Sequence, residues 1–200
     1  MNLQESNLCF EFDGTFRAIK FDDTKFYRKK FQLLPDGKGV DFLAKNERTF
    51  LLVEVKNCKG HESDNRWRIA PDNRKCSTAP TTVDTTNRVS FDVEISQKVT
   101  MTLACLIGVH TQPEYQNHSD ELKEYSEALR SLNFSQSTNE IKILFLLEGD
   151  FSTRTRPQKL IMKALCDSIK RKLSWLNCSI LVENIEEHQK HERYFKVCGV

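Results

Sequence analysis

Apolar and polar residues alternate along two neighbouring segments, Gly37–Ala44 and Thr49–Asn57. Side chains in a strand point to opposite faces in turn, so this alternation predicts two β-strands. Between them the polar residues Asn46, Glu47 and Arg48 interrupt the apolar pattern, which is typical of a turn. The two segments therefore predict a β-hairpin.

The hydrophobic pattern also predicts the register of this hairpin. If Lys45 pairs with Phe50, Asp41 lies opposite Glu54, and Lys56 shares the face of Glu54. A register shifted by one residue would mix polar and apolar side chains on both faces. The favoured register brings two carboxylates to one face with Cβ atoms about 4.5–5.5 Å apart, where they repel each other. A divalent cation would remove this repulsion; the alternative is a solvent-facing strand pair with ordinary surface charges.

The remaining pattern predicts a single α/β domain over residues 1–200, with its core at about 37–185. The sheet is expected to be mixed: antiparallel at the hairpins and parallel where helices cross over. The other predicted elements are an N-terminal β-hairpin over 8–21, a short helix within 24–34, a long polar loop over 61–89, a helix over 90–110, a helical insertion over 119–132, a central strand over 141–149, a helix over 156–176 and a final strand over 178–186.

Composition narrows the picture only slightly. The chain has 200 residues with 38% hydrophobic and 29% charged residues, as in a soluble globular protein. The net charge of +2 means that any basic surface must be local. The first residues lack the basic and apolar regions of a signal peptide, and no apolar run is long enough to span a membrane. We therefore expect a cytoplasmic protein whose seven cysteines are reduced thiols.

The segments GVDFLA, FLLVEVKN, DVEISQKVTMTLACLIG and IKILFLLEG together resemble the PD-(D/E)xK, or restriction-endonuclease-like, nuclease superfamily. The resemblance covers roughly residues 37–149, without 61–89. It implies a restriction-endonuclease-like mixed sheet flanked by helices. One departure is that Val40, not proline, precedes Asp41. Pro35-Asp36 supplies the literal dipeptide, but Asp36 falls in a turn, and strand parity favours Asp41.

The resemblance implies Mg²⁺- or Mn²⁺-dependent hydrolysis of nucleic-acid phosphodiesters, with DNA as the expected substrate. Asp41, Glu54 and the backbone carbonyl of Val55 would hold the cation. Lys56 would orient the attacking water or stabilise the developing charge on phosphorus. Many such nucleases add a further residue from a helix, and Gln97 is the expected one.

The helix that carries Gln97 also carries Glu94 and Lys98 on the same face, at positions i and i+4. Their ordinary interpretation is a solvated ion pair within one helix. Both interpretations of this helix face stay open on the sequence alone.

The loop after Lys56 carries basic residues and an aromatic one: Arg66, Trp67, Arg68 and Arg74. Such interleaving suits nucleic-acid phosphates and a stacked base, although a basic cluster is more often a solvated face. The expected partner is nucleic acid, with no membrane contact, and a homodimer is left open. Two alternatives to a nuclease remain: a catalytically silent module of the same fold that binds nucleic acid or a protein partner, and a structural subunit that docks through the helix of Tyr125.

Overall fold

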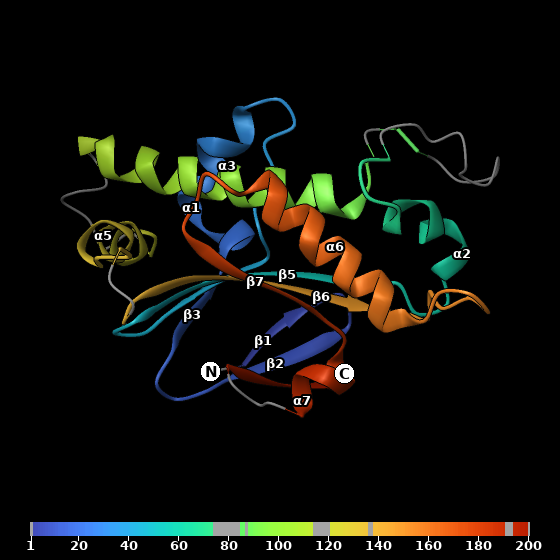
Figure 1. Cartoon of the computed structure of the whole chain (residues 1–200). Helices are drawn as coiled ribbons and strands as arrows, with labels where there is room; N and C mark the ends of the chain where they lie inside the picture. Colours follow the sequence, from blue (N-terminus) through green and yellow to red (C-terminus); the bar gives the residue numbers. More distant parts are fainter. Residues whose placement is uncertain are drawn as a thin grey trace.

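The structure is a computed structural model that describes residues 2–73, 85–86, 88–113, 121–135, 138–190 and 194–199. Two sheets lie face to face, and helices cover the outer face of the larger one (Figure 1). The larger sheet has the order β3-β4-β5-β6-β7, and the smaller has the order β1-β2-β8. The strands of the two sheets are β1 (Asn2–Glu5), β2 (Leu8–Phe12), β3 (Arg17–Lys20), β4 (Phe42–Lys45), β5 (Thr49–Asn57), β6 (Glu140–Glu148), β7 (Cys178–Glu183) and β8 (Phe195–Gly199). The main helices are α1 (Lys25–Lys29), α3 (Phe91–Thr111), α5 (Lys123–Ser131), α6 (Gln158–Lys172) and α7 (Ile185–Gln189).

The larger sheet is mixed, as the sequence predicts. Strands β3, β4 and β5 pair antiparallel, whereas β5, β6 and β7 pair parallel. The chain leaves β5 and returns to β6 by way of α3, and it leaves β6 and returns to β7 by way of α6. Parallel neighbours need such crossovers, and this explains why β6 is apolar almost throughout.

The predicted N-terminal hairpin over residues 8–21 is wrong. Strand β2 pairs with β1 and β8 in the small sheet, whereas β3 pairs with β4 in the large one. The turn after Asp13 does form, with the Phe16 N–H donating to the Asp13 carbonyl at 2.9 Å, but it carries the chain from one sheet to the other. The N-terminal hairpin is β1–β2, whose turn residues Ser6 and Asn7 have φ of 52° and 61°.

The structure also corrects three boundaries. The predicted loop over 61–89 contains two short helices, α2 (Glu62–Asn65) and the 3-10 helix η3 (Arg66–Ile69). The strand over 178–186 ends at Glu183, and it is followed by α7 and the unpredicted β8. Helix α5 lies within the predicted insertion 119–132, whose first two residues fall outside the described part of the chain.

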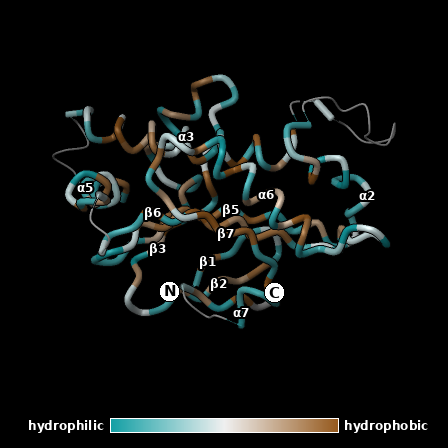
Figure 2. The backbone as a smooth tube through the Cα atoms, viewed as in Figure 1, coloured by the Kyte–Doolittle hydropathy of each residue, from teal (hydrophilic) through white to brown (hydrophobic). Residues whose placement is uncertain are grey.

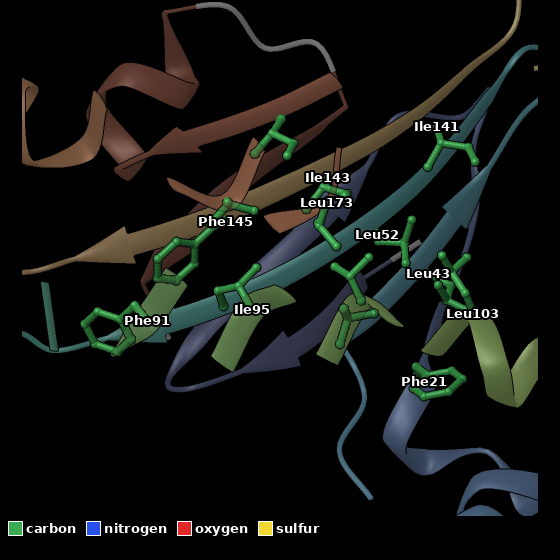
Figure 3. Close-up of a cluster of buried hydrophobic side chains, with 14 of the residues drawn as sticks. Phe21, Leu43, Leu52, Phe91, Ile95, Leu103, Ile141, Ile143, Phe145 and Leu173 are labelled. Atoms are coloured by element: carbon green, nitrogen blue, oxygen red, sulfur yellow. The ribbon is translucent and has the colours of Figure 1, made fainter. Parts of the chain in front are cut away.

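Two apolar layers hold the elements together. The first lies between the large sheet and the helices, where Phe91, Ile95 and Leu103 of α3 pack over the sheet (Figure 3). The second lies between the sheets, where Phe10 contacts Phe42 with ring centroids 4.9 Å apart. Hydrophobic residues accordingly follow the strands and the helix faces turned to them (Figure 2).

Alternate residues of β5 face different layers, so the strand's polar side chains emerge on the helix side. Leu52 belongs to the helix-facing layer, whereas Leu51, Val53 and Val55 belong to the layer between the sheets. Glu54 shares the face of Leu52 by strand parity. No helix in the described part of the chain combines the length and apolar character needed to cross a membrane.

Candidate active site

The hairpin β4–β5 has the predicted register. Lys45 pairs with Phe50 and Phe42 pairs with Val53, and the Asn46 N–H donates to the Thr49 carbonyl at 3.0 Å. Asp41 lies one residue before this pairing, at the position that the same register sets opposite Glu54.

Asp41 is the last residue of the loop that leads into β4. Its backbone N–H donates to the Val53 carbonyl at 3.0 Å, and its side-chain Oδ2 accepts the N–H of Val55 at 2.7 Å. The carboxylate thus takes the place of a backbone acceptor at the end of the pairing. Asp41 is 8% exposed and Glu54 is 1% exposed, so both acids are buried.

Lys98 of α3 joins the two acids. Its Nζ lies 2.6 Å from Glu54 Oε1 and 3.7 Å from Asp41 Oδ1. One ammonium group therefore contacts both carboxylates, which converge on the helix-facing side of the sheet. Lys56 lies beside them, with its Nζ 2.8 Å from Glu54 Oε1.

The ion pairs continue away from the two acids. Lys56 Nζ also lies 3.1 Å from Glu94 Oε1, and the other oxygen of Glu94 pairs with Arg68. Among the described residues, these pairs form one alternating row of acids and bases. The row runs Asp41, Lys98, Glu54, Lys56, Glu94 and Arg68.

Burial and like charge weaken Asp41 as an acid. Burial first, and then the neighbouring Glu54, raise the pKa of Asp41 to about 7, against the opposing effects of Lys98, Lys56 and the Val55 N–H. Burial acts to lower the pKa of Lys56, but the charges of Glu54 and Glu94 outweigh it and raise that pKa.

Glu94 responds in the opposite way. Burial acts to raise the pKa of its carboxyl group, but Lys56 and Arg68 outweigh burial and lower the pKa. Glu94 is therefore held in its charged form by its two partners, whereas Asp41 titrates near neutral pH.

One of the two carboxylate oxygens of Glu54 accepts no hydrogen bond among the described residues. This oxygen is Oε2, and it is buried. A buried carboxylate oxygen that accepts no hydrogen bond lacks stabilisation that water would give it. This oxygen, together with Asp41, therefore fits a hard divalent cation such as Mg²⁺. The described residues hold no group of three or more His, Cys, Asp and Glu side chains placed to bind a metal.

Gln97 is not brought to these acids. It is exposed and lines a groove of about 440 Å³ between α3 and α6, together with Asp36 and Lys172. Lys98, one residue further on, makes the contact with Glu54 instead. Glu94 and Lys98 pair with partners on other elements rather than with each other.

The basic segment is placed largely inside the protein. Arg66 is exposed and donates to the Phe151 carbonyl at 3.1 Å. Trp67 and Arg68 are 3% and 4% exposed, and the Arg68 guanidinium lies 4.2 Å from the ring centre of Phe91. Arg74 falls outside the described residues. Tyr125 is 1% exposed, so the face of α5 that carries it packs on the core.

Comparison with known proteins gives a family but no activity. No curated protein and no solved structure matches the chain. A family model does match, over residues 24–198, and the chain therefore belongs to a family of unknown function (DUF6661).

Proposed function

We propose that the chain is a nuclease that hydrolyses phosphodiester bonds with the help of Mg²⁺ or Mn²⁺, and that DNA is its substrate. The observation that carries this proposal is the convergence of two buried carboxylates, Asp41 and Glu54, beside Lys56. The order of elements supports it: a strand pair with these residues, then α3, then the parallel strand β6. This order is similar to that of the restriction-endonuclease-like fold, which we propose for the large sheet and its helices.

The cation would be held by Asp41, Glu54 and the carbonyl of Val55. Oε2 of Glu54 supports this assignment, because it has no hydrogen-bond partner among the described residues and a divalent ion would supply one. The Val55 N–H points to Asp41, and the N–H and C=O of a strand residue face the same neighbour, so the Val55 carbonyl faces the Asp41 side. When bound, the cation would polarise the phosphate and lower the pKa of a water molecule.

The chain's own groups have distinct roles in this proposal. The ammonium of Lys56 would stabilise the negative charge that develops on the phosphate in the transition state. Glu94 and Glu54 hold this ammonium in place from two sides, which fixes its position before substrate binds. The exposed guanidinium of Arg66 would contact a phosphate of the nucleic acid.

A cleavage assay on the purified full chain tests the proposal. Single- and double-stranded DNA and RNA are incubated with Mg²⁺ or Mn²⁺, and we expect cleavage of DNA that a chelator abolishes. Asp41→Ala and Glu54→Gln should fold and be inactive. Lys56→Met should lower turnover by about 10²–10³ while it still binds Mn²⁺.

The control for this assay is Asp36→Asn, which changes an exposed carboxylate in the turn before β4 and should cleave like the wild type. Cleavage that survives Glu54→Gln would show a contaminant or another site. If no substrate is cut by a wild type that has been shown to bind Mn²⁺, the nuclease proposal is wrong.

A second function is favoured by a separate observation. The acids of the site already have basic partners, so the row of charges is balanced without a metal. This is what a catalytically silent module that binds nucleic acid or a protein partner would show. Absence of Mn²⁺ binding, measured by calorimetry on the wild type, would support this second function.

A further inference from the structure

Lys98 occupies the place between the two acids that the proposed function assigns to a metal. Among the described residues, it is the base that contacts both Asp41 and Glu54. Its side chain is only 12% exposed. Water therefore screens this contact little, and the ammonium acts on the two carboxylates at close range.

The row of charges shows why a metal and this ammonium exclude each other. In the described part of the chain the row has three acids and three bases, Asp41, Glu54 and Glu94 against Lys56, Lys98 and Arg68. The ionised row is neutral, and a divalent ion would give it an excess of two positive charges. A buried excess charge is unfavourable, so binding of the ion requires that a base leave the acids.

Of the other two bases, Arg68 is held by several further contacts, and Lys56 pairs with Glu94 instead of Asp41. Arg68 donates to the Val89 carbonyl at 2.9 Å and to Asn65 Oδ1 at 3.3 Å, and it stacks on Phe91. Lys56 bridges Glu54 and Glu94, and in the described part of the chain it forms no ion pair with Asp41. Lys98 is therefore the base that a cation on Asp41 and Glu54 would meet.

The backbone of Lys98 is fixed, so the side chain has to move. Thr102 Oγ1 donates to the Lys98 carbonyl at 2.8 Å and accepts the Val40 N–H at 3.0 Å, which ties this turn of α3 to the residue before Asp41. The four-carbon stem of lysine allows its ammonium group to change place without movement of the helix.

A second carboxylate lies within reach of the Lys98 charge. Asp22 has a buried Oδ1 without a hydrogen-bond partner in the described part of the chain. Burial raises the pKa of Asp22, and the charges of Lys20 and Lys98 act against that rise. Asp22 is thus a buried acid on which the Lys98 charge already acts.

We propose that Lys98 is the resident cation of this site: its ammonium group neutralises Asp41 and Glu54 in the metal-free protein and leaves them when a divalent ion binds. This inference rests on the proposed function, because it takes Asp41 and Glu54 as the ligands of that ion. It gives the protein a site that stays charge-balanced and folded without metal.

Calorimetric titration of the full chain with Mn²⁺ alone tests the inference, at about pH 8.5 so that Asp41 is ionised. Lys98→Met keeps the stem and removes the charge, and we expect it to bind Mn²⁺ about tenfold or more tightly than the wild type. Lys98→Arg keeps the charge and should not bind more tightly. Lys172→Met is the matched control, because it removes a lysine that pairs with the buried Asp92, away from the site.

A second measurement needs no variant. In ¹⁵N spectra of lysine side chains of the wild type, addition of Mg²⁺ should shift the Nζ resonance of Lys98 more than that of Lys172. Equal Mn²⁺ affinity of the wild type and Lys98→Met, or weaker binding by Lys98→Met, would overturn the inference and leave the nuclease proposal intact. Absence of Mn²⁺ binding by both proteins would overturn the two together.

Discussion

Replacement of Asp41 by Asn is expected to stabilise the protein at neutral and higher pH. Burial and the charge of Glu54 raise the pKa of Asp41 from 3.8 to about 7 in the folded protein. Between these values the folded state holds a proton that the unfolded state lacks, so the wild type loses stability as the pH rises through this window. Above pH 7 the loss is complete, and the difference in pKa corresponds to about 4 kcal/mol.

Asn mimics the protonated carboxyl group imperfectly, because its NH₂ group must lie near the ammonium of Lys98. We therefore expect Asp41→Asn to raise the free energy of unfolding by about 2 kcal/mol at about pH 8, half of that limit. Below about pH 4 both states of the wild type are protonated at this position, and the gain should vanish.

Urea unfolding of the wild type and Asp41→Asn, followed by circular dichroism from about pH 8 down to about pH 5, measures this gain. Asp36→Asn serves as the control, because its carboxylate is exposed and its left-handed φ of 59° suits Asn as well as Asp. A gain that stays the same across this range, or a loss of stability at the upper end, would refute the assignment of Asp41 as an acid whose pKa is raised by burial and by Glu54.

Two further predictions follow from close contacts and exposed charge. Gly39→Ala should lower the free energy of unfolding by about 2 kcal/mol or more in urea unfolding, because a Cβ there would lie 2.2 Å from the Phe21 ring. Gly14→Ala should change it little, because among the described residues a Cβ there would meet nothing within 4 Å beyond its own chain neighbours. Arg66→Glu should weaken binding to DNA and flatten its salt dependence in fluorescence titrations, whereas Arg48→Glu, in the turn at the other end of β5, should not. Equal binding by both variants would remove Arg66 from the proposed interface.

Local periodicity predicted the parts of the fold that depend on neighbours in the sequence. The hairpin β4–β5, strand β6 and the helices α3 and α6 all carry a clear pattern, and the structure contains each of them. The small sheet joins the two ends of the chain, because β2 pairs with β8. A period of two in β2 indicates a strand but not its partner, so the pattern pairs the apolar run after Asp13 with the wrong neighbour.

The difference between local pattern and tertiary packing also explains which residues of the candidate site the sequence could predict. Strand parity fixed the face of Asp41 and Glu54, since each step along a strand reverses the side chain. A helix turns by about 100° per residue, so the choice between Gln97 and Lys98 depends on its rotation. The apolar stripe that begins at Ile95 could have decided it, because Gln97 lies about 200° from Ile95 and thus faces away from the sheet.

No periodic pattern in the sequence predicts the burial of Trp67 and Arg68. Both lie in a polar stretch without a period, and an arginine is rarely buried unless it is paired. Its partner, Glu94, is 26 residues further on and belongs to another element. The packing of η3 against the start of α3, through Arg68 and Phe91, is therefore a tertiary contact that no local pattern contains.

Strand β5 extends beyond the start of its antiparallel partner β4, and this explains where Asp41 and Glu54 meet. Strand β4 begins at Phe42, whereas β5 continues past Val53 to Asn57, so within the described residues the last part of β5 has no partner strand on this side. Asp41 fills the first open position by accepting the Val55 N–H. On the other side, pairing with β6 continues to Asn57. Glu54 and Lys56 therefore project from a strand that is paired on one side, and on the other side Asp41 reaches them from a loop while Lys98 reaches them from α3.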